Sequence, residues 1–462
     1  MNLPGRFAFG RAWPLSPRSI SLSGLREILL RDTNIVVISV VLTNVLRAGS
    51  TVVLTRLLVP EVFGIAGLIA SLQFTVALAS DLGFQAFVVR HQDGDKQRFL
   101  DTVWTVSLIR SCLLAAVLIG LSQPLAGFFG QPHLAPMIAA SGLIFVIEGL
   151  ASLTLLTALR NRMILRLSAL ELIALSAQIG ASAVLAYLWG SYWALLGGMM
   201  MGSALKTLLS YAMFRNPFRQ IAFDRAYLRE LWLFARYVTG SSIIFLLISQ
   251  CDKLVLAKVM PLDHFGFYIL AGNLAAAPLG FATAYASRVL YPAYSQAWRD
   301  GQKDLCGIFY GKRRMVSVAY AFAAGGIIGC APLIIGILYD DRFAEAAFYL
   351  QILGIAPLFA LASSAANETL TATGRISVTF EASCAKLVWL AAAGTAGFLA
   401  LGVLGLVLAV GLMELPALFL KWIRMHYAGL LNLKEELWFV GAGAAGVGAG
   451  WLATLALGRW LV

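Results

Sequence analysis

Long apolar runs, separated by short charged or Pro/Gly-rich segments, follow one another from residue 33 to residue 458. A helix that crosses a bilayer needs about 20 mostly apolar residues. Backbone polar groups in lipid must be bonded within their own segment, and the alternating pattern of barrel strands is absent, so these runs are expected to be helices. The pattern predicts an all-α polytopic membrane protein with about 12–14 transmembrane helices. Thirteen runs qualify: 33–58, 63–89, 102–124, 134–158, 168–189, 191–214, 231–257, 265–287, 312–338, 345–370, 377–400, 402–424 and 436–458.

Composition supports the same class. Hydrophobic residues make up 60% and charged residues 13% of the 462 residues, whereas soluble domains carry about 25% charged residues. An ordinary soluble enzyme is therefore excluded. The 35 Lys and Arg exceed the 23 Asp and Glu, and the formal net charge of +12 would suggest a nucleic-acid partner in a soluble protein.

The positions of the basic residues assign this charge to the membrane instead. Cytoplasmic loops of membrane proteins retain Lys and Arg. Of the 35 basic residues, 25 fall in the N-terminal tail and every second loop, four in the opposite loops and six inside spans. This bias predicts a cytoplasmic N-terminus and, after thirteen spans, an outer C-terminus. It also predicts contact with anionic membrane lipids and no nucleic-acid partner.

An internal repeat surrounds the loop between the first two helices of each half. LTRLLVPEVFGIAGLIASL (Leu54–Leu72) and LAKVMPLDHFGFYILAGNL (Leu256–Leu274) align at an offset of 202 residues. The Phe-Gly pair is identical in register, and Arg56 and Glu61 match Lys258 and Asp263. Both halves then start in the same orientation, which requires an even number of helices in each. Two six-helix lobes with a site between them, as in parallel-repeat transporters, are expected.

This repeat predicts the domain organisation. A basic segment contains a short amphipathic surface helix around residues 22–29 and precedes the first lobe. A cytoplasmic linker joins the lobes, and a C-terminal transmembrane segment follows the second lobe. The predicted boundaries are 1–32 for the N-terminal segment, 33–214 for the N-lobe, 215–230 for the linker, 231–424 for the C-lobe and 425–462 for the C-terminal segment.

Three stretches resemble a known family. Arg56–Arg90 and Asp252–Ser295 resemble bacterial polysaccharide exporters of the oligosaccharide flippase group, in the multidrug/oligosaccharidyl-lipid/polysaccharide exporter superfamily, and Ala331–Arg375 looks like the family's ninth and tenth helices. The resemblance covers roughly residues 30–425. It implies a location in the bacterial inner membrane, a central cavity between the lobes and a polyprenyl-diphosphate-linked glycan as substrate. It also suggests polysaccharide polymerase or other assembly proteins as partners. Family members usually have twelve or fourteen helices, so thirteen is a departure.

Charges inside spans are the candidate site residues, because each costs about 2.5–3.5 kcal/mol at mid-bilayer. Arg47 lies roughly 21 Å along the first helix, too deep to reach the interface easily. Asp252 and Lys253 occupy a similar depth in the seventh helix, where Asp252 is the repeat equivalent of Ser50. Alternatively, they pair with each other or with Asp263 at the interface. Three residues near cytoplasmic helix ends are predicted to guard the inner mouth of the cavity or to snorkel: Asp81, Arg236 and Arg288.

Other charged residues in or near spans have simpler interpretations. Arg110 is expected to form a structural ion pair with Glu148 of the next helix. Glu414, with Pro416 nearby, is expected at a kinked packing site. Four residues near span ends are expected at the interface: Glu171, Lys206, Glu381 and Lys386.

Motifs for metal, nucleotide and enzyme chemistry are missing from the sequence. The five cysteines form no CxxC pair, the four histidines form no ligand cluster, and no GxxxxGK[ST] sequence occurs. The GxxxG pairs Gly198/Gly202, Gly325/Gly329 and Gly446/Gly450 are expected to pack helices closely. No cofactor, metal or enzymatic activity is expected.

These observations favour a flippase that moves an undecaprenyl-diphosphate-linked oligosaccharide outward by alternating access. Basic residues would hold the diphosphate. Two alternatives stay open at this stage. One is a cation-coupled small-molecule or drug antiporter of the same superfamily, for which central carboxylates are expected. The other is a non-transporting scaffold of a glycan-assembly complex. The sequence does not identify the sugar repeat or a coupling ion.

Overall fold

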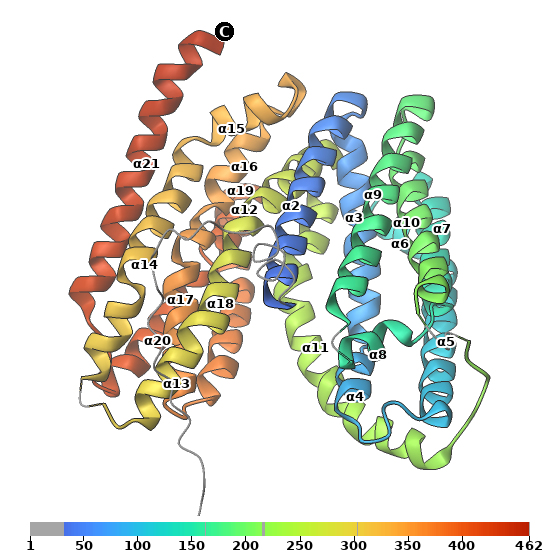
Figure 1. Ribbon diagram of the computed structural model, residues 1–462. Coiled ribbons are helices and arrows are strands. Elements are labelled where there is room, and N and C mark those ends of the chain that lie inside the picture. Colours follow the sequence, from blue (N-terminus) through green and yellow to red (C-terminus); the bar gives the residue numbers. More distant parts are fainter. Residues whose placement is uncertain (1–31, 162, 215–217, 303, 462) are drawn as a thin grey trace, which may run out of the picture.

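Helices form all the regular structure of the computed structural model, which describes residues 32–161, 163–214, 218–302 and 304–461 (Figure 1). Within these residues no strand is present. The predicted surface helix at residues 22–29 lies outside them.

The described helices fall into two bundles joined by the long helix α11 (Arg225–Val259) (Figure 1). The first bundle contains α2 (Asp32–Leu57), α3 (Pro60–Ala79), α4 (Phe84–Arg90), α5 (Gln97–Gly120), α6 (Ser122–Phe128), η1 (Pro132–Leu134), α7 (Ala135–Gly149), α8 (Thr154–Arg160), α9 (Ile164–Trp189) and α10 (Trp193–Ala212). The second contains α12 (Leu262–Tyr285), η2 (Ala286–Leu290), α13 (Tyr291–Arg299), α14 (Leu305–Gly329), α15 (Ala331–Leu338), η3 (Asp341–Phe343), α16 (Ala346–Leu353), α17 (Ile355–Ala372), α18 (Ser377–Leu401), α19 (Val403–Gly411), α20 (Glu414–Tyr427) and α21 (Leu433–Leu461).

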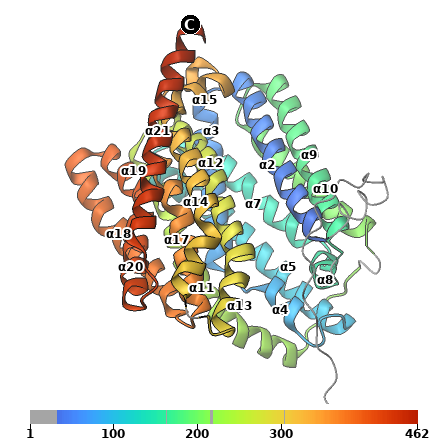
Figure 2. The ribbon, with the colours of Figure 1, turned by 60° about the vertical axis from the view of Figure 1, so that its left-hand side comes forward.

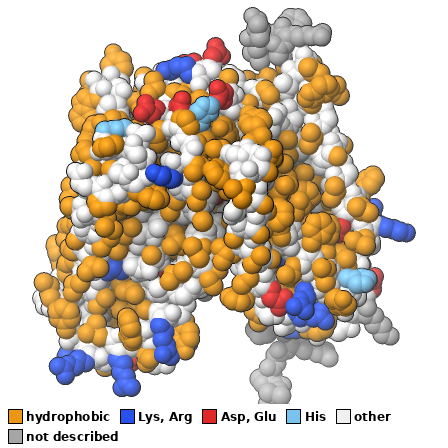
Figure 3. Space-filling model, turned by 180° about the vertical axis from the view of Figure 1, so that it is seen from behind, with side chains coloured by type: hydrophobic (Ala, Val, Ile, Leu, Met, Phe, Trp, Pro, Cys, Tyr) orange, Lys and Arg blue, Asp and Glu red, His pale blue; other side chains and the backbone are white. Residues whose placement is uncertain are grey.

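Eleven spans among the described residues are long and apolar enough to cross a membrane, and the bent pair α14–α15 gives a twelfth if counted as one span. The ninth predicted span is this pair, bent by 69° at Cys330, where Pro332 removes a backbone donor. The sixth predicted span folds as α10, which packs along α9 but falls outside that count. Hydrophobic side chains cover most of the face seen in Figure 3. The prediction of an all-α polytopic membrane protein is confirmed.

The two copies of the repeat lie against each other where α3 meets α12. A Cβ atom at Gly64 would overlap the backbone carbonyl of Leu262, and one at Gly266 would overlap the carbonyl of Pro60. These contacts are equivalent at the offset of 202 residues. The glycine shared by both copies of the repeat therefore has a structural reason, because only glycine lets the two backbones come this close.

The GxxxG pairs pack helices as predicted. In the α14–α21 contact, a Cβ at Gly325 would meet the carbonyl of Gly443, and one at Gly450 would meet the carbonyl of Gly326. Arg313 of α14 and Glu436 of α21 form an ion pair buried in the same contact, with side chains 3% and 1% exposed. The C-terminal helix α21 is thus tied to the second bundle by close backbone contact and by charge.

The N-terminal end of α11 is held to the first bundle by polar contacts. The Tyr227 hydroxyl donates to Asp93 at 2.8 Å, and His91 lies 2.7 Å from Glu230. Hydrogen bonds from Lys96 and Tyr227 hold the pKa of Asp93 below its usual value. Asp93 therefore stays ionised, and keeps its hydrogen bond from Tyr227, until the pH falls below that lowered pKa. Further along, α11 packs on α3 and also on α18 and α19.

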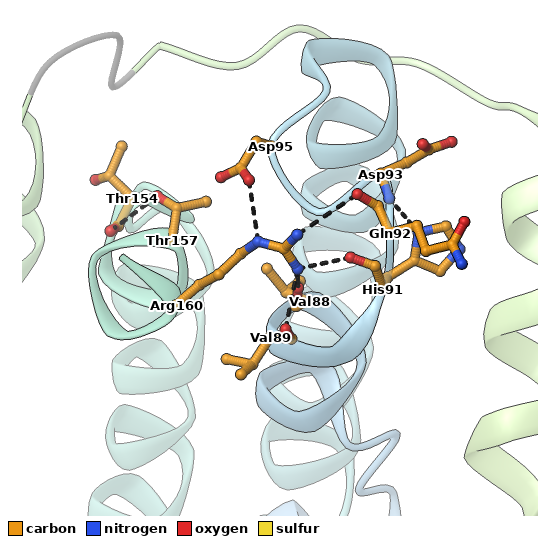
Figure 4. Close-up of polar contacts among 9 residues, drawn as sticks. All are labelled: Val88, Val89, His91, Gln92, Asp93, Asp95, Thr154, Thr157 and Arg160. Carbon is orange, nitrogen blue, oxygen red and sulfur yellow. Dashed lines mark hydrogen bonds and ion pairs between the residues drawn. The ribbon is translucent and has the colours of Figure 1, made fainter. Parts of the chain in front are cut away.

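Arg160, in the last turn of α8, fastens the loop between α4 and α5 (Figure 4). Its Nε pairs with Asp95 at 3.0 Å, and its Nη1 donates to the carbonyls of Val88, Val89 and His91 at 3.1, 2.9 and 2.6 Å. These carbonyls stand at the end of α4, where no further helical turn can bond them. α4 and α8 lie together at the lower end of the first bundle (Figure 2).

We expect Arg160→Met to loosen this end locally. Losing the charge-assisted bonds is expected to cost about 1.5–3 kcal/mol, which corresponds to about 10- to 100-fold faster hydrogen exchange of the amides in residues 87–100. Exchange is measured by mass spectrometry, with Arg166→Met as the control, since Arg166 is an exposed arginine of α9. Unchanged exchange in the Arg160 variant would show that the contacts do not hold the loop.

Candidate functional site

A polar cavity of about 530 Å³ lies in the second bundle, between the end of α12, η2, α17, α18 and α20. Side chains with hydroxyl, amide or charged groups form most of its wall. Its lining residues are Thr283, Ala284, Ser287, Arg288, Ser364, Asn367, Glu368, Thr379, Ala382, Ser383, Lys386 and Lys421. We call it the basic cavity, because three of these residues are cations and one is an anion.

The π-helical segment η2 brings Arg288 to this cavity. It follows α12, which contains Pro278, and an extra residue per turn in such a segment shifts the side chains that come after it. Arg288 is exposed, and among the described residues no hydrogen-bond acceptor or carboxylate pairs with its guanidinium. It is therefore a cation available to a ligand.

The two lysines of the basic cavity are held by protein groups. The Nζ atom of Lys421 donates to the carbonyl and Oγ atoms of Ser363 at 3.1 and 2.9 Å. Lys386 forms an ion pair with Glu414, whose side chain is 9% exposed. A buried carboxylate left without its cation would be costly, so this pair fixes α18 against α20.

Lys386, expected near the membrane interface, pairs with buried Glu414 and lines the basic cavity. One expectation from the sequence is wrong here, because Arg110 does not pair with Glu148. Its Nε and Nη2 atoms donate to the carbonyls of Ser80 and Ala77 at 2.7 and 2.6 Å, whereas Glu148 accepts from Ser203. Carbonyls at the end of a helix have no partner in a further helical turn and can accept from a cation.

Of the six predicted site residues, only Arg288 lines the basic cavity. Arg47 lies exposed on α2, which packs along α9 (Figure 2), and among the described residues no hydrogen bond or ion pair holds its guanidinium. Asp252 is buried and accepts a hydrogen bond from the hydroxyl of Tyr268. Among the described residues, the Lys253 ammonium forms no ion pair with Asp252 or Asp263. Lys253 is half-buried beside Asp252.

Asp81 and Arg236 lie where the end of α3 meets α11. A carboxylate oxygen of Asp81 accepts from the Gly83 amide and another from the Ser242 hydroxyl, both at 2.9 Å. The Thr239 hydroxyl donates to the Asp81 carbonyl at 2.6 Å. Asp81 thus ties the turn after α3 to α11. The guanidinium of Arg236 stacks over the Tyr237 ring at 4.7 Å and donates to its hydroxyl.

The basic cavity can hold an anion that carries polar substituents, because cations and hydroxyl groups converge on one space. A family of polysaccharide biosynthesis proteins matches residues 53–348, more than half of the chain. The chain belongs to this family. The resemblance noted in the sequence, to a family of bacterial polysaccharide proteins, is confirmed.

Curated relatives of this polysaccharide biosynthesis protein carry corresponding names. The lipopolysaccharide biosynthesis protein WzxC of Escherichia coli (strain K12) is 24% identical over 363 residues, which cover 78% of this chain and 73% of WzxC. The succinoglycan biosynthesis transport protein ExoT of Rhizobium meliloti is 23% identical, over 64% of this chain and 59% of ExoT.

Solved structures share the fold. The lipid II flippase MurJ, in an inward closed conformation, has a TM-score of 0.67 and 12% identity, covering 92% of this chain and 99% of MurJ. An inward-facing multidrug transporter of the same superfamily has a TM-score of 0.62 and 12% identity, covering 84% of this chain and 95% of that one. These structures show the fold that the chain shares with them, and the chain is a polytopic membrane protein of a polysaccharide biosynthesis family.

Proposed function

We propose that the chain is a flippase that carries a polyprenyl-diphosphate-linked oligosaccharide, with undecaprenyl as the lipid, from the cytoplasmic to the outer face of the inner membrane. The basic cavity is the observation that carries this proposal. The unpaired guanidinium of Arg288 suits a diphosphate, and Lys386 and Lys421, which protein groups hold, add positive charge beside it. The surrounding hydroxyl and amide groups suit a glycan. The family and the names of WzxC and ExoT support a substrate of this class.

The proposed mechanism is alternating access between the lobes 33–214 and 231–424, with residues 425–462 moving with the second lobe. The positive-inside bias supports a cytoplasmic N-terminus, which would place the Gly64–Gly266 contact near the outer face. α12 would then run from the outer face to the cytoplasmic end at Tyr285, so Arg288 would lie in the inner half. A substrate entering from the cytoplasm would meet Arg288 while the lobes are open on that side. The lobes would then close there and open toward the outer face.

Reconstitution into liposomes tests the function. Purified protein should move a fluorescent undecaprenyl-diphosphate-linked oligosaccharide between leaflets, measured as the fraction accessible to an added membrane-impermeant glycosidase. Transport of organic cations coupled to an ion gradient, without movement of the lipid-linked sugar, would instead identify an antiporter. If the protein retains its helical circular dichroism and transports neither substrate, the proposal is overturned. The non-transporting scaffold would then be the alternative that fits.

A further inference from the structure

A second cavity, of about 540 Å³, lies between α5 and α11, where the first bundle meets the helix that joins the bundles. One face of each helix forms most of it, and Ser80 and Leu82, at the end of α3, complete it. On α11 these residues follow at intervals of three or four, which places them in one stripe: Trp232, Arg236, Gly240 and Ile243. Ile109 and Leu113 form the matching stripe on α5. We call this space the α5–α11 groove.

Apolar side chains line most of the groove and remain accessible within it. Ile109 is 50% exposed, Leu113 is 61% exposed and Ile243 is 41% exposed. No heavy atom lies within 4 Å of the place where a Cβ of Gly240 would stand. The glycine therefore leaves room in the groove rather than allowing two helices to touch.

One end of the groove carries a cation without a counter-charge. Among the described residues, no carboxylate lies within ion-pair distance of Arg236, whose guanidinium meets only the Tyr237 hydroxyl and ring. The groove's other arginine, Arg110, is already bonded to two carbonyls of α3. Trp232 and Tyr237 are 71% and 69% exposed beside Arg236, and such aromatic residues are typical of the headgroup level of a membrane.

We propose that the α5–α11 groove binds an anionic phospholipid from the leaflet on the side of the α11 N-terminus. Arg236 and the Tyr237 hydroxyl would hold the phosphate, and an acyl chain would lie along Ile109, Leu113 and Ile243. From Arg236 to Ile243 the helix rises about 10 Å, less than half of a hydrocarbon core about 30 Å thick. This depth suits a lipid of one leaflet and not a chain that reaches the opposite one.

Lipid retention tests the proposal directly, and it does not depend on whether the protein transports lipid-linked sugar. Full-length protein is purified from mixed micelles of phosphatidylglycerol and phosphatidylcholine, and retained lipids are counted by native mass spectrometry. Wild-type protein is expected to retain one phosphatidylglycerol in preference. Arg236→Gln should lower the retention of phosphatidylglycerol about tenfold or more, with phosphatidylcholine unchanged, because one charge-assisted contact is lost.

Gly240→Phe provides a second variant, which should fill the groove and remove both lipids. Gly180→Phe is its control, because Gly180 lies on α9 in equally open space and does not line the groove. The proposal is overturned if Arg236→Gln retains phosphatidylglycerol like wild type, or if Gly240→Phe loses no more lipid than Gly180→Phe. It is also overturned if undecaprenyl phosphate, added at equal concentration, displaces phosphatidylglycerol completely, since the groove would then hold a polyprenyl chain.

Discussion

Arg288→Glu is expected to lower the initial rate of lipid-linked sugar movement at least about 100-fold. The substitution replaces the unpaired guanidinium of the basic cavity with a carboxylate that repels the diphosphate. Loss of one charge-assisted contact is worth about 1.5–3 kcal/mol, or about 10- to 100-fold, and the like-charge repulsion adds to it. Rates are measured in proteoliposomes over a range of substrate concentrations.

Arg299→Glu is the matched control for this prediction. Arg299 is an exposed residue at the end of α13 and does not line the basic cavity. Its replacement by Glu changes the net charge by the same amount. Its rate should stay near that of the wild type. Arg288→Lys should recover part of the rate, since an ammonium keeps the charge but loses the two-pronged contact of a guanidinium. If Arg288→Glu transports as fast as Arg299→Glu, the basic cavity does not hold the diphosphate.

Gly266→Val is expected to abolish transport, with a loss of about 100-fold or more. The new side chain would overlap the backbone carbonyl of Pro60, and backbone cannot move aside as a flexible side chain does. The two copies of the repeat must then separate. Helix contacts made through glycine depend on such a close approach of the two backbones. The state in which the lobes are closed at the Gly64–Gly266 contact should therefore no longer form.

Distances between spin labels at Leu121 and Ile337 measure that separation. Both are exposed residues, one after α5 in the first bundle and one on α15 in the second, and they are changed to cysteine in a chain without the five native cysteines. Gly280→Val on the same helix α12 is the control, because no heavy atom lies within 4 Å of its Cβ position. An unchanged distance distribution in Gly266→Val, together with normal transport, would show that the close contact is dispensable.

Hydrophobic patterning was sufficient to predict the helical class and the approximate position of most spans, because length and apolar content are properties of the local sequence. The repeat at Phe63-Gly64 and Phe265-Gly266 also predicted which segments are equivalent. The alignment of the two copies indicated that the segments are equivalent but not that they are in contact, because that contact depends on the tertiary structure. The structure shows that the equivalent glycines meet.

The partners of buried charges were not predictable from the sequence. Lys386 and Glu414 are 28 residues apart, on helices whose facing sides depend on the rotation of each helix about its axis. A rotation of one residue position, about 100° on a helix, would aim Lys386 elsewhere. Arg110 shows the complementary error. Its expected partner was the Glu148 carboxylate, whereas carbonyls at the end of α3 accept its hydrogen bonds.

Because Gly64 meets the backbone at Leu262 and Gly266 meets it at Pro60, each half of the chain presents the same surface to the other. An interface of this kind has the symmetry of a homodimer. A gene for a single six-helix half would already encode both sides of the contact. Duplication and fusion would then join two surfaces that matched beforehand, and each copy would become free to change its remaining residues independently.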